Sequence, residues 1–211
     1  MARPPPPGGV MHGRVYADGS RLFAEHSYNG LIALQGWAFA IYDEEGKVTA
    51  SAFGITPWWA VGIFVAELWA LMNAAQNAFP GNPFFVDCMA VKRGSRNGTA
   101  WASAPSRRFA RAWIPLAHVL EEYPEAVEWV PAHCNKASVG VKRLSNGAFL
   151  SDTDLAANAN VDLLAKRGAR EYAPTFREKS SILTASALVT DIARWIGICT
   201  VLANHICRRN I

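Results

Sequence analysis

The order of strand-like and helix-like patterns constrains the fold of this chain more than any other feature. Three β-rich runs come first, at residues 13–19, 37–42 and 48–55, each bounded by glycine or polar turn residues. The second and third runs flank the short segment 43–47 ("DEEGK"), which predicts a hairpin. The chain therefore opens with three strands, most simply an antiparallel meander.

Helical and strand-like patterns alternate in the rest of the chain. Residues 61–79 carry apolar side chains at helical spacing and are rich in Ala and Leu, which predicts a helix. A short apolar run at 84–87, a helix-like region with an arginine cluster, a strand at 125–133 and a helix at 150–172 follow. This order predicts an α/β fold: a five-stranded mixed sheet, its first three strands antiparallel, flanked by helices. The order alone leaves several such folds open.

Composition limits the size of the core and the kind of partner. The 211 residues, 51% of them hydrophobic, are enough for one sizeable core with extensions at either end. The formal net charge of +4 permits a polyanionic partner such as nucleic acid without requiring one. The four cysteines form no CxxC pair, so we expect a reduced intracellular chain, cytoplasmic or nuclear.

Both ends of the chain differ in composition from its middle. Residues 1–11 are rich in Pro and Gly and predict a disordered lead-in. Near the other end, the apolar stretch 186–206 is interrupted by Asp191 and Arg194. Because charges in mid-span are costly in lipid, we expect this stretch to pack on the core or lie on a surface, with no membrane partner. Residues 173–211 are therefore predicted to form a C-terminal helical extension.

Four acidic residues occupy places where an unpaired carboxylate is usually avoided. Asp18 ends the first predicted strand, Asp87 ends the fourth, and Glu67 and Asp162 lie in apolar helical segments. Taken singly, each is equally well explained as a solvated surface charge. If they converge, they repel one another by roughly 4 kcal/mol per close pair at an intermediate dielectric. Hard divalent cations relieve such repulsion, so the set predicts a site for Mg²⁺ or Mn²⁺.

Five short motifs, in this order along the chain, resemble the successive motifs of the ribonuclease H family. They are "YADGS" around Asp18, "AELWAL" around Glu67, "FFVDC" around Asp87, "WVPAH" around His133 and "NANVDLLAKRG" around Asp162. The resemblance spans residues 12–172 and implies a ribonuclease H-like catalytic domain there. The last motif departs from the family pattern Asn-Glu-x-Ala-Asp, since Ala159 and Val161 stand in place of the glutamate and the alanine.

The resemblance implies a specific activity and specific roles. Members of the family hydrolyse the RNA strand of RNA–DNA hybrids with two divalent metal ions, so the resemblance implies two Mg²⁺ or Mn²⁺ ions. By position, Asp18, Glu67, Asp87 and Asp162 match the metal-binding carboxylates, with Asp18 as the one that bridges the ions. His133 matches the family's mobile histidine, which is thought to help proton movement or product departure.

Contacts to the hybrid are expected mainly with its backbone and sugars. The candidate nucleic-acid-binding residues are Gly19, Ser20, Lys92, Arg93 and Arg96. Further basic residues at Arg107, Arg108 and Arg111 interleave with Trp101 and Trp113, and the tryptophans could pack against sugars of the DNA strand. Equally, these arginines could solvate a helix face while the tryptophans pack in the core.

Two other functions remain open at this point. One is a DNA-acting nuclease or transposase-like protein of the same superfold, and the other is a non-catalytic nucleic-acid-binding domain. The "WVPAH" and terminal-helix motifs favour ribonuclease H over the first. The Pro-rich lead-in and the apolar C-terminal segment also fit a domain that derives from a reverse-transcriptase-bearing element.

Overall fold

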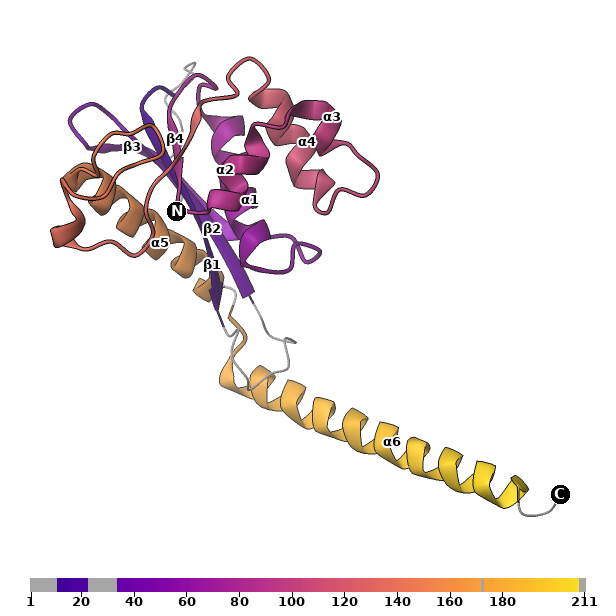
Figure 1. The fold of residues 1–211 in the computed structure, drawn as a ribbon. Coiled ribbons are helices and arrows are strands. Elements are labelled where there is room, and N and C mark those ends of the chain that lie inside the picture. Colours follow the sequence, from indigo (N-terminus) through magenta and orange to yellow (C-terminus); the bar gives the residue numbers. More distant parts are fainter. Residues whose placement is uncertain (1–10, 23–33, 172, 209–211) are drawn as a thin grey trace. The chain divides into compact units, whose positions relative to one another are not determined.

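A five-stranded mixed sheet organises the main domain (Figure 1). The computed structural model describes residues 11–22, 34–171 and 173–208. Its strands are β1 (Arg14–Leu22), β2 (Leu34–Tyr42), β3 (Val48–Ile55), β4 (Phe84–Val86) and β5 (Val127–Trp129). Its α-helices are α1 (Ile63–Asn77), α2 (Met89–Ser95), α3 (Gly98–Ala102), α4 (Ala110–Val119), α5 (Asp152–Glu171) and α6 (Phe176–Arg208), with a 3-10 turn at Lys136–Ser138.

The strands are ordered β3-β2-β1-β4-β5 across the sheet. β2 is antiparallel to both β1 and β3, while β4 pairs parallel with β1 and β5 pairs parallel with β4. In the hairpin between β2 and β3, the Asp43 side chain accepts hydrogen bonds from the backbone N–H groups of Glu45 and Lys47. The predicted five-stranded mixed sheet with an antiparallel beginning is confirmed.

Both faces of the sheet are covered, because alternate residues of β1 enter two separate cores. Val15 and Ala17 belong to a core that includes Leu68 of α1, whereas Tyr16 belongs to a second core that includes Val161 of α5. Successive side chains of a strand point to opposite faces, so α1 and α5 cover opposite sides of the sheet. Figure 1 shows the two helices on either side of the strands.

Close approach of backbone to backbone fixes the position of α5 against the sheet. A Cβ atom added at Gly36 of β2 would lie 1.9 Å from the Ala165 carbonyl oxygen of α5. A Cβ atom at Gly168 of α5 would lie 2.5 Å from the Gly54 carbonyl oxygen of β3. Glycine at these two positions therefore allows α5 to pack directly on the antiparallel half of the sheet.

Some predicted boundaries are wrong, and backbone chemistry explains one of them. β1 runs to Leu22, three residues beyond the predicted strand, and the helix-like region after β4 consists of three short helices. β5 ends at Trp129 instead of residue 133. Pro131 has no N–H to donate to a strand ladder, and His133 has a φ of 50°, so neither continues the strand.

α6 belongs to a second compact unit and is described by itself. A single helix occupies most of the segment predicted as a C-terminal helical extension, and none of its side chains from 176 to 205 is buried. Phe176–His205 is long and apolar enough to cross a membrane, with a mean hydropathy of 1.5 in its best window.

The predicted lead-in falls almost entirely outside the described residues, which begin at Met11. Met11 itself is buried and forms a β-bridge with Ala78.

Candidate active site

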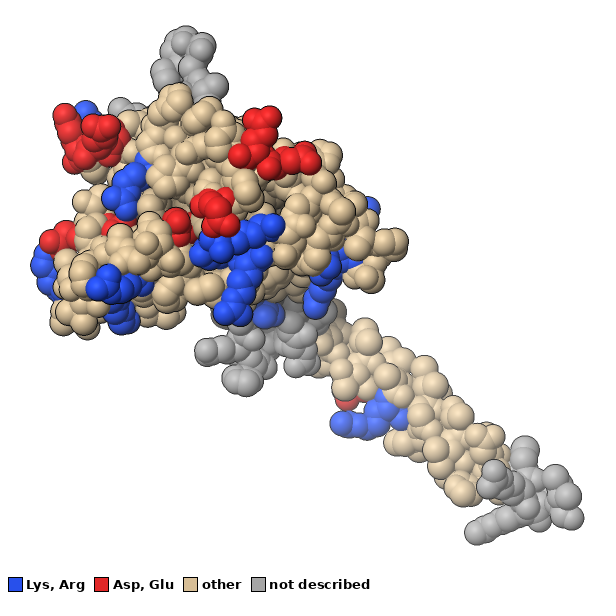
Figure 2. Space-filling model, turned by 45° about the horizontal axis from the view of Figure 1, so that its top comes forward, with Lys and Arg blue, Asp and Glu red and all other residues tan. Residues whose placement is uncertain are grey.

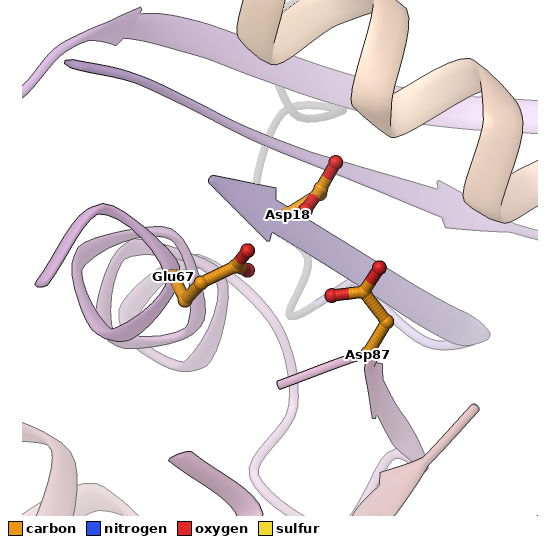
Figure 3. Close-up of side chains that lie close together, drawn as sticks. All are labelled: Asp18, Glu67 and Asp87. Carbon is orange, nitrogen blue, oxygen red and sulfur yellow. The ribbon is translucent and has the colours of Figure 1, made fainter. Parts of the chain in front are cut away.

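Three carboxylates from separate elements meet at one point. Asp18 from β1, Glu67 from α1 and Asp87, the residue after β4, each offer an oxygen atom, and the three oxygens lie within 4.8 Å of one another. Figure 3 shows the three side chains pointing toward a common centre. Asp18 and Glu67 are buried and Asp87 is half-buried. The sequence prediction that these distant residues converge is met for this triad.

The parallel pairing of β1 and β4 brings Asp18 and Asp87 together. Ala17 pairs with Val86 and the residue after each is an aspartate, so both aspartates lie where the parallel pairing of β1 and β4 ends. The carboxyl ends of parallel strands are where open α/β sheets bind ligands.

Gly19 brings α1 close enough for Glu67 to join the two aspartates. A Cβ atom at Gly19 would lie 2.4 Å from the Glu67 backbone nitrogen, so only glycine fits between β1 and α1 at this point. The Gly19 N–H also donates a hydrogen bond of 2.9 Å to Oε2 of Glu67. The role of Gly19 in the structure is therefore to position a carboxylate.

Burial and mutual repulsion shift the pKa values of the triad upward. Burial first, and then the charges of Asp87 and Asp162, raise the pKa of Asp18 to about 7. Burial, with the charges of Asp18 and Asp87, raises the pKa of Glu67 well above its ordinary value. Burial also raises the pKa of Asp87, although the charge of His133 and a hydrogen bond from Asn158 oppose the shift. The cluster is therefore held together against its own electrostatic repulsion.

Asp162 of α5 lines the same cavity, of about 560 Å³, but lies outside the tight triad. Its carboxylate accepts a hydrogen bond of 2.6 Å from Nζ of Lys166, one helical turn further along. Its charge is close enough to raise the pKa of both Asp18 and Asp87. Asp162 thus contributes a fourth negative charge to the cavity, partly balanced by its lysine neighbour.

His133 and Asn158 complete the polar lining beside Asp87. His133 lies in the loop after β5, in the left-handed backbone region at a φ of 50°, and lines the cavity. Asn158 lies one turn before Asp162 on α5, and its side-chain amide donates to Asp87. Its other side-chain atom, Oδ1, is buried and has no hydrogen-bond partner. An orphaned buried oxygen beside carboxylates is a place where a cation or an ordered water fits.

The donor set fits a hard divalent cation. Carboxylate and amide oxygens are the ligands that Mg²⁺ and Mn²⁺ favour, and positive charge would relieve the repulsion that raises the pKa values of the triad. The residues that would hold such ions are Asp18, Glu67, Asp87 and Asp162. Two thiols, Cys88 and Cys134, line the same cavity.

Asp154 ties the start of α5 to β1 beneath this site. Its buried Oδ1 accepts hydrogen bonds from the Arg14 guanidinium at 2.5 Å and from the Tyr16 hydroxyl at 2.6 Å. Its Oδ2 accepts one from the Ser151 hydroxyl at 2.5 Å. Since β1 carries Asp18, this network fixes α5 relative to the strand that bears the central carboxylate.

The predicted nucleic-acid-binding residues occupy different environments. Gly19 and Ser20 line the carboxylate cavity, and Ser20 is buried. Lys92 is buried, with 7% of its surface exposed. Arg93 lines a second cavity, and Arg96 forms an ion pair with Glu125.

The second cavity, of about 900 Å³, adjoins the first and is lined by basic and aromatic residues. Arg21 lines both cavities, and its buried Nε has no hydrogen-bond partner. The Arg107 guanidinium lies 3.5 Å from the ring centroid of Trp101, and Trp113 is buried in the core. Figure 2 shows Lys and Arg side chains spread along the lower part of the main domain in that view, with some Asp and Glu side chains among them and others above.

Sequence reasoning missed two of the polar groups at the site, and each had a signal. Arg21 stands three residues beyond Asp18, on a strand that was predicted too short. Asn158 stands four residues before Asp162, a spacing that places both on one face of a helix.

Comparison with known proteins gives matches only among solved structures. No family model matches the chain, and no curated protein matches it. The solution structure of the PFV RNase H domain matches with a TM-score of 0.54 and 15% identity, over 77% of this chain and 96% of that domain. The crystal structure of a Prototype Foamy Virus protease-reverse transcriptase mutant matches with a TM-score of 0.55 and 18% identity, over 78% of this chain and 21% of the other.

These matches show the fold alone, because the sequence identities, 15% and 18%, are too low to carry a function across. The chain spans about a fifth of the foamy virus protease-reverse transcriptases it matches. The strand order, the parallel attachment of β4 and β5 and the helices on both faces agree with that comparison. The main domain of this chain has a ribonuclease H-like fold.

Proposed function

We propose that this chain is a metal-dependent nuclease that hydrolyses the RNA strand of RNA–DNA hybrids with two Mg²⁺ ions, for which Mn²⁺ can substitute. The observation that carries the proposal is the triad of Asp18, Glu67 and Asp87. Three carboxylates from separate elements approach within 4.8 Å in a site that raises the pKa of each. Holding three mutually repelling carboxylates together in a buried site does not stabilise the fold, so the cluster is best explained by a function that requires it.

The residues of the site have distinct expected roles. Bound ions at such a site make water nucleophilic at neutral pH and stabilise the leaving oxygen of the phosphodiester. Asp18 would be the carboxylate best placed to contact both ions, because it belongs to the triad and lines the same cavity as Asp162. Asn158 restrains Asp87 through its amide. His133, next to Asp87, is expected to carry protons at working pH, which the imidazole side chain does readily.

The basic and aromatic lining next to the carboxylates supports a nucleic-acid substrate. Arg21, Arg93, Arg107 and Arg108 line the second cavity, and Arg21 joins it to the site. Guanidinium groups pair well with phosphates, and aromatic rings pack on sugars and bases. A foamy viral protease-reverse transcriptase solved in complex with an RNA/DNA hybrid matches this fold with a TM-score of 0.50 and 14% identity. We take the hybrid as the substrate by that analogy.

Cleavage of matched duplexes tests the proposal. An RNA–DNA hybrid, a double-stranded RNA and a double-stranded DNA of one sequence, each labelled on one strand, are incubated with Mg²⁺, Mn²⁺ or EDTA. We expect cleavage of the RNA strand of the hybrid in either metal, none in EDTA, and loss of cleavage in Asp87→Asn. Asp152→Asn is the matched control, because this aspartate is exposed and paired with Lys136.

Two results would contradict the proposal. Cleavage of DNA alone would point to a DNA-acting nuclease of the same fold. Equal cleavage by the wild type and Asp87→Asn would remove the carboxylate site from the reaction.

A further inference from the structure

The long C-terminal helix α6 has no place in the proposed nuclease chemistry. Its 33 residues would measure about 50 Å at 1.5 Å per residue. Among the side chains of α6 that the structure describes, ten large apolar ones have 40% or more of their surface exposed: Phe176, Leu183, Leu188, Val189, Ile192, Trp195, Ile196, Ile198, Val201 and Leu202. In water, so much exposed apolar surface on one helix is unfavourable, so a non-aqueous surrounding is needed.

The distribution of these side chains argues against a protein groove or a coiled-coil partner as that surrounding. At 100° per residue, Leu183, Leu188 and Ile196 point in directions well apart around the helix axis. Ile198 and Leu202 point between Leu183 and Leu188, and Ile192 points between Leu188 and Ile196, so the apolar side chains cover about two thirds of the circumference. A groove or a coiled-coil seam covers only one stripe of a helix. The remaining stripe carries small residues, among them Ser186, Ala193 and Gly197, and it carries no charge between Ser180 and Asn204.

Length and charge distribution match a lipid bilayer. Between Ser180 and Asn204 the helix holds 25 residues, against the roughly 20 needed to cross the hydrocarbon layer. The two charges in this stretch, Asp191 and Arg194, are of opposite sign and lie 3.9 Å apart as an i,i+3 ion pair. Charges inside a membrane are tolerated mainly when they pair in this way. Arg177 precedes the stretch by three residues, where lipid headgroups would meet it.

We propose that α6 spans a lipid bilayer and attaches the ribonuclease H-like domain to a membrane. This proposal replaces the sequence expectations of a core-packing or surface-lying helix and of no membrane partner, and it does not depend on the nuclease activity. A helix that lay flat in the membrane surface would need a broad, strongly charged face, and α6 between Ser180 and Asn204 has none.

Depth-dependent fluorescence quenching distinguishes the two membrane arrangements. Trp195 lies close to the middle of the apolar stretch, so a spanning helix places its indole near the bilayer centre. The full chain is reconstituted into phosphatidylcholine–phosphatidylglycerol vesicles that contain phosphatidylcholine brominated at either a shallow or a deep acyl position. The quenching due to Trp195 is obtained by difference from Trp195→Phe, which removes one of eight tryptophans. We expect this difference to be largest with the deep bromines.

Flotation of the vesicles supplies the second readout and its controls. We expect the wild type and Asp87→Asn to float with the vesicles and to stay bound in alkaline carbonate. The double variant Ile196→Glu, Val201→Glu places charges on different sides of the helix, so no flat orientation keeps both in water, and we expect it to remain in the aqueous fraction. Its main domain is separate from these positions, so unchanged near-ultraviolet circular dichroism from that domain would exclude misfolding. Strongest quenching by shallow bromines, or a wild-type chain that stays soluble beside the vesicles, overturns the proposal.

Discussion

Replacing Asp18 by asparagine should make the metal-free protein more stable while it abolishes metal binding. The pKa of Asp18 rises from its ordinary value of 3.8 to about 7 through burial and the charges of Asp87 and Asp162. A carboxyl whose pKa is raised in the folded state stabilises the fold at pH values below its unfolded pKa, and that contribution is lost as the pH rises through the folded pKa. The metal-free wild type should therefore lose stability between about pH 4 and pH 7 because of this residue.

Two independent routes give the size of the effect. A shift of about three pKa units corresponds to about 4 kcal/mol between the acid and alkaline limits. Coulomb repulsion between two carboxylate oxygens at the 4.8 Å limit of the triad is about 3.5 kcal/mol at an effective dielectric constant near 20. We expect Asp18→Asn to stabilise the metal-free protein by about 2–4 kcal/mol at pH 8 and by less than about 1 kcal/mol at pH 4.

Urea unfolding in EDTA at the two pH values measures this difference. Asp152→Asn is the matched control, since its carboxylate is exposed and pairs with Lys136 at the surface, where such pairs contribute about 1 kcal/mol or less. Saturating Mg²⁺ should reverse the ranking, because only the wild type can gain stability from the ion. If Asp18→Asn is instead less stable than the wild type at pH 8 in EDTA, the carboxylates are stabilised by protein partners and the reasoning fails.

Three further changes test the support of the site and its surroundings. Gly36→Ala places a Cβ atom 1.9 Å from the Ala165 carbonyl oxygen and should lower the stability measured by thermal unfolding by about 1–3 kcal/mol. An unchanged melting temperature would contradict the direct packing of α5 on β2. Asp154→Asn weakens the hydrogen bonds to Arg14 and Tyr16 and should lower the free energy of unfolding in urea by about 1–3 kcal/mol. We also expect cleavage to require a higher Mg²⁺ concentration. A loss of stability with an unchanged Mg²⁺ requirement would show that Asp154 supports only the fold. His133→Ala should slow hybrid cleavage about 10- to 100-fold while leaving the Mg²⁺-induced gain in stability intact, and loss of that gain would make His133 part of the metal site.

The sheet could be predicted from the sequence because each strand leaves a local pattern, and such patterns recur along the chain. Period-two patterns, a turn signal and alternating helical segments specified the five strands and most of the helices. β5 was predicted too long because an apolar run continues into Pro131, where the missing N–H ends the ladder. Lys92 was expected at a nucleic-acid surface, but it is buried on α2, where Gly94 packs against the Trp113 ring; such packing between short helices has no signature in the sequence.

The candidate site was predictable to the level of which residues meet, and no further. Asp18 and Asp87 directly follow the last residues paired between β1 and β4, Ala17 and Val86, so parallel pairing was enough to bring them together. The pairing of Asp162 with Lys166 and the orphaned oxygen of Asn158 depend on side-chain rotamers, which the sequence does not specify. For α6, the sequence alone left a core-packing and a surface-lying helix open, because apolar content does not specify what covers a helix.

Titration of Mn²⁺ tests most directly whether the convergent carboxylates form a cation site. The electron paramagnetic resonance signal of free Mn²⁺ is followed as the ion is added to the wild type, Asp18→Asn and Asp152→Asn at pH 8. We expect the wild type and Asp152→Asn to deplete the free ion alike, and Asp18→Asn not to deplete it. Equal depletion by all three proteins would place the bound ions elsewhere and contradict the account.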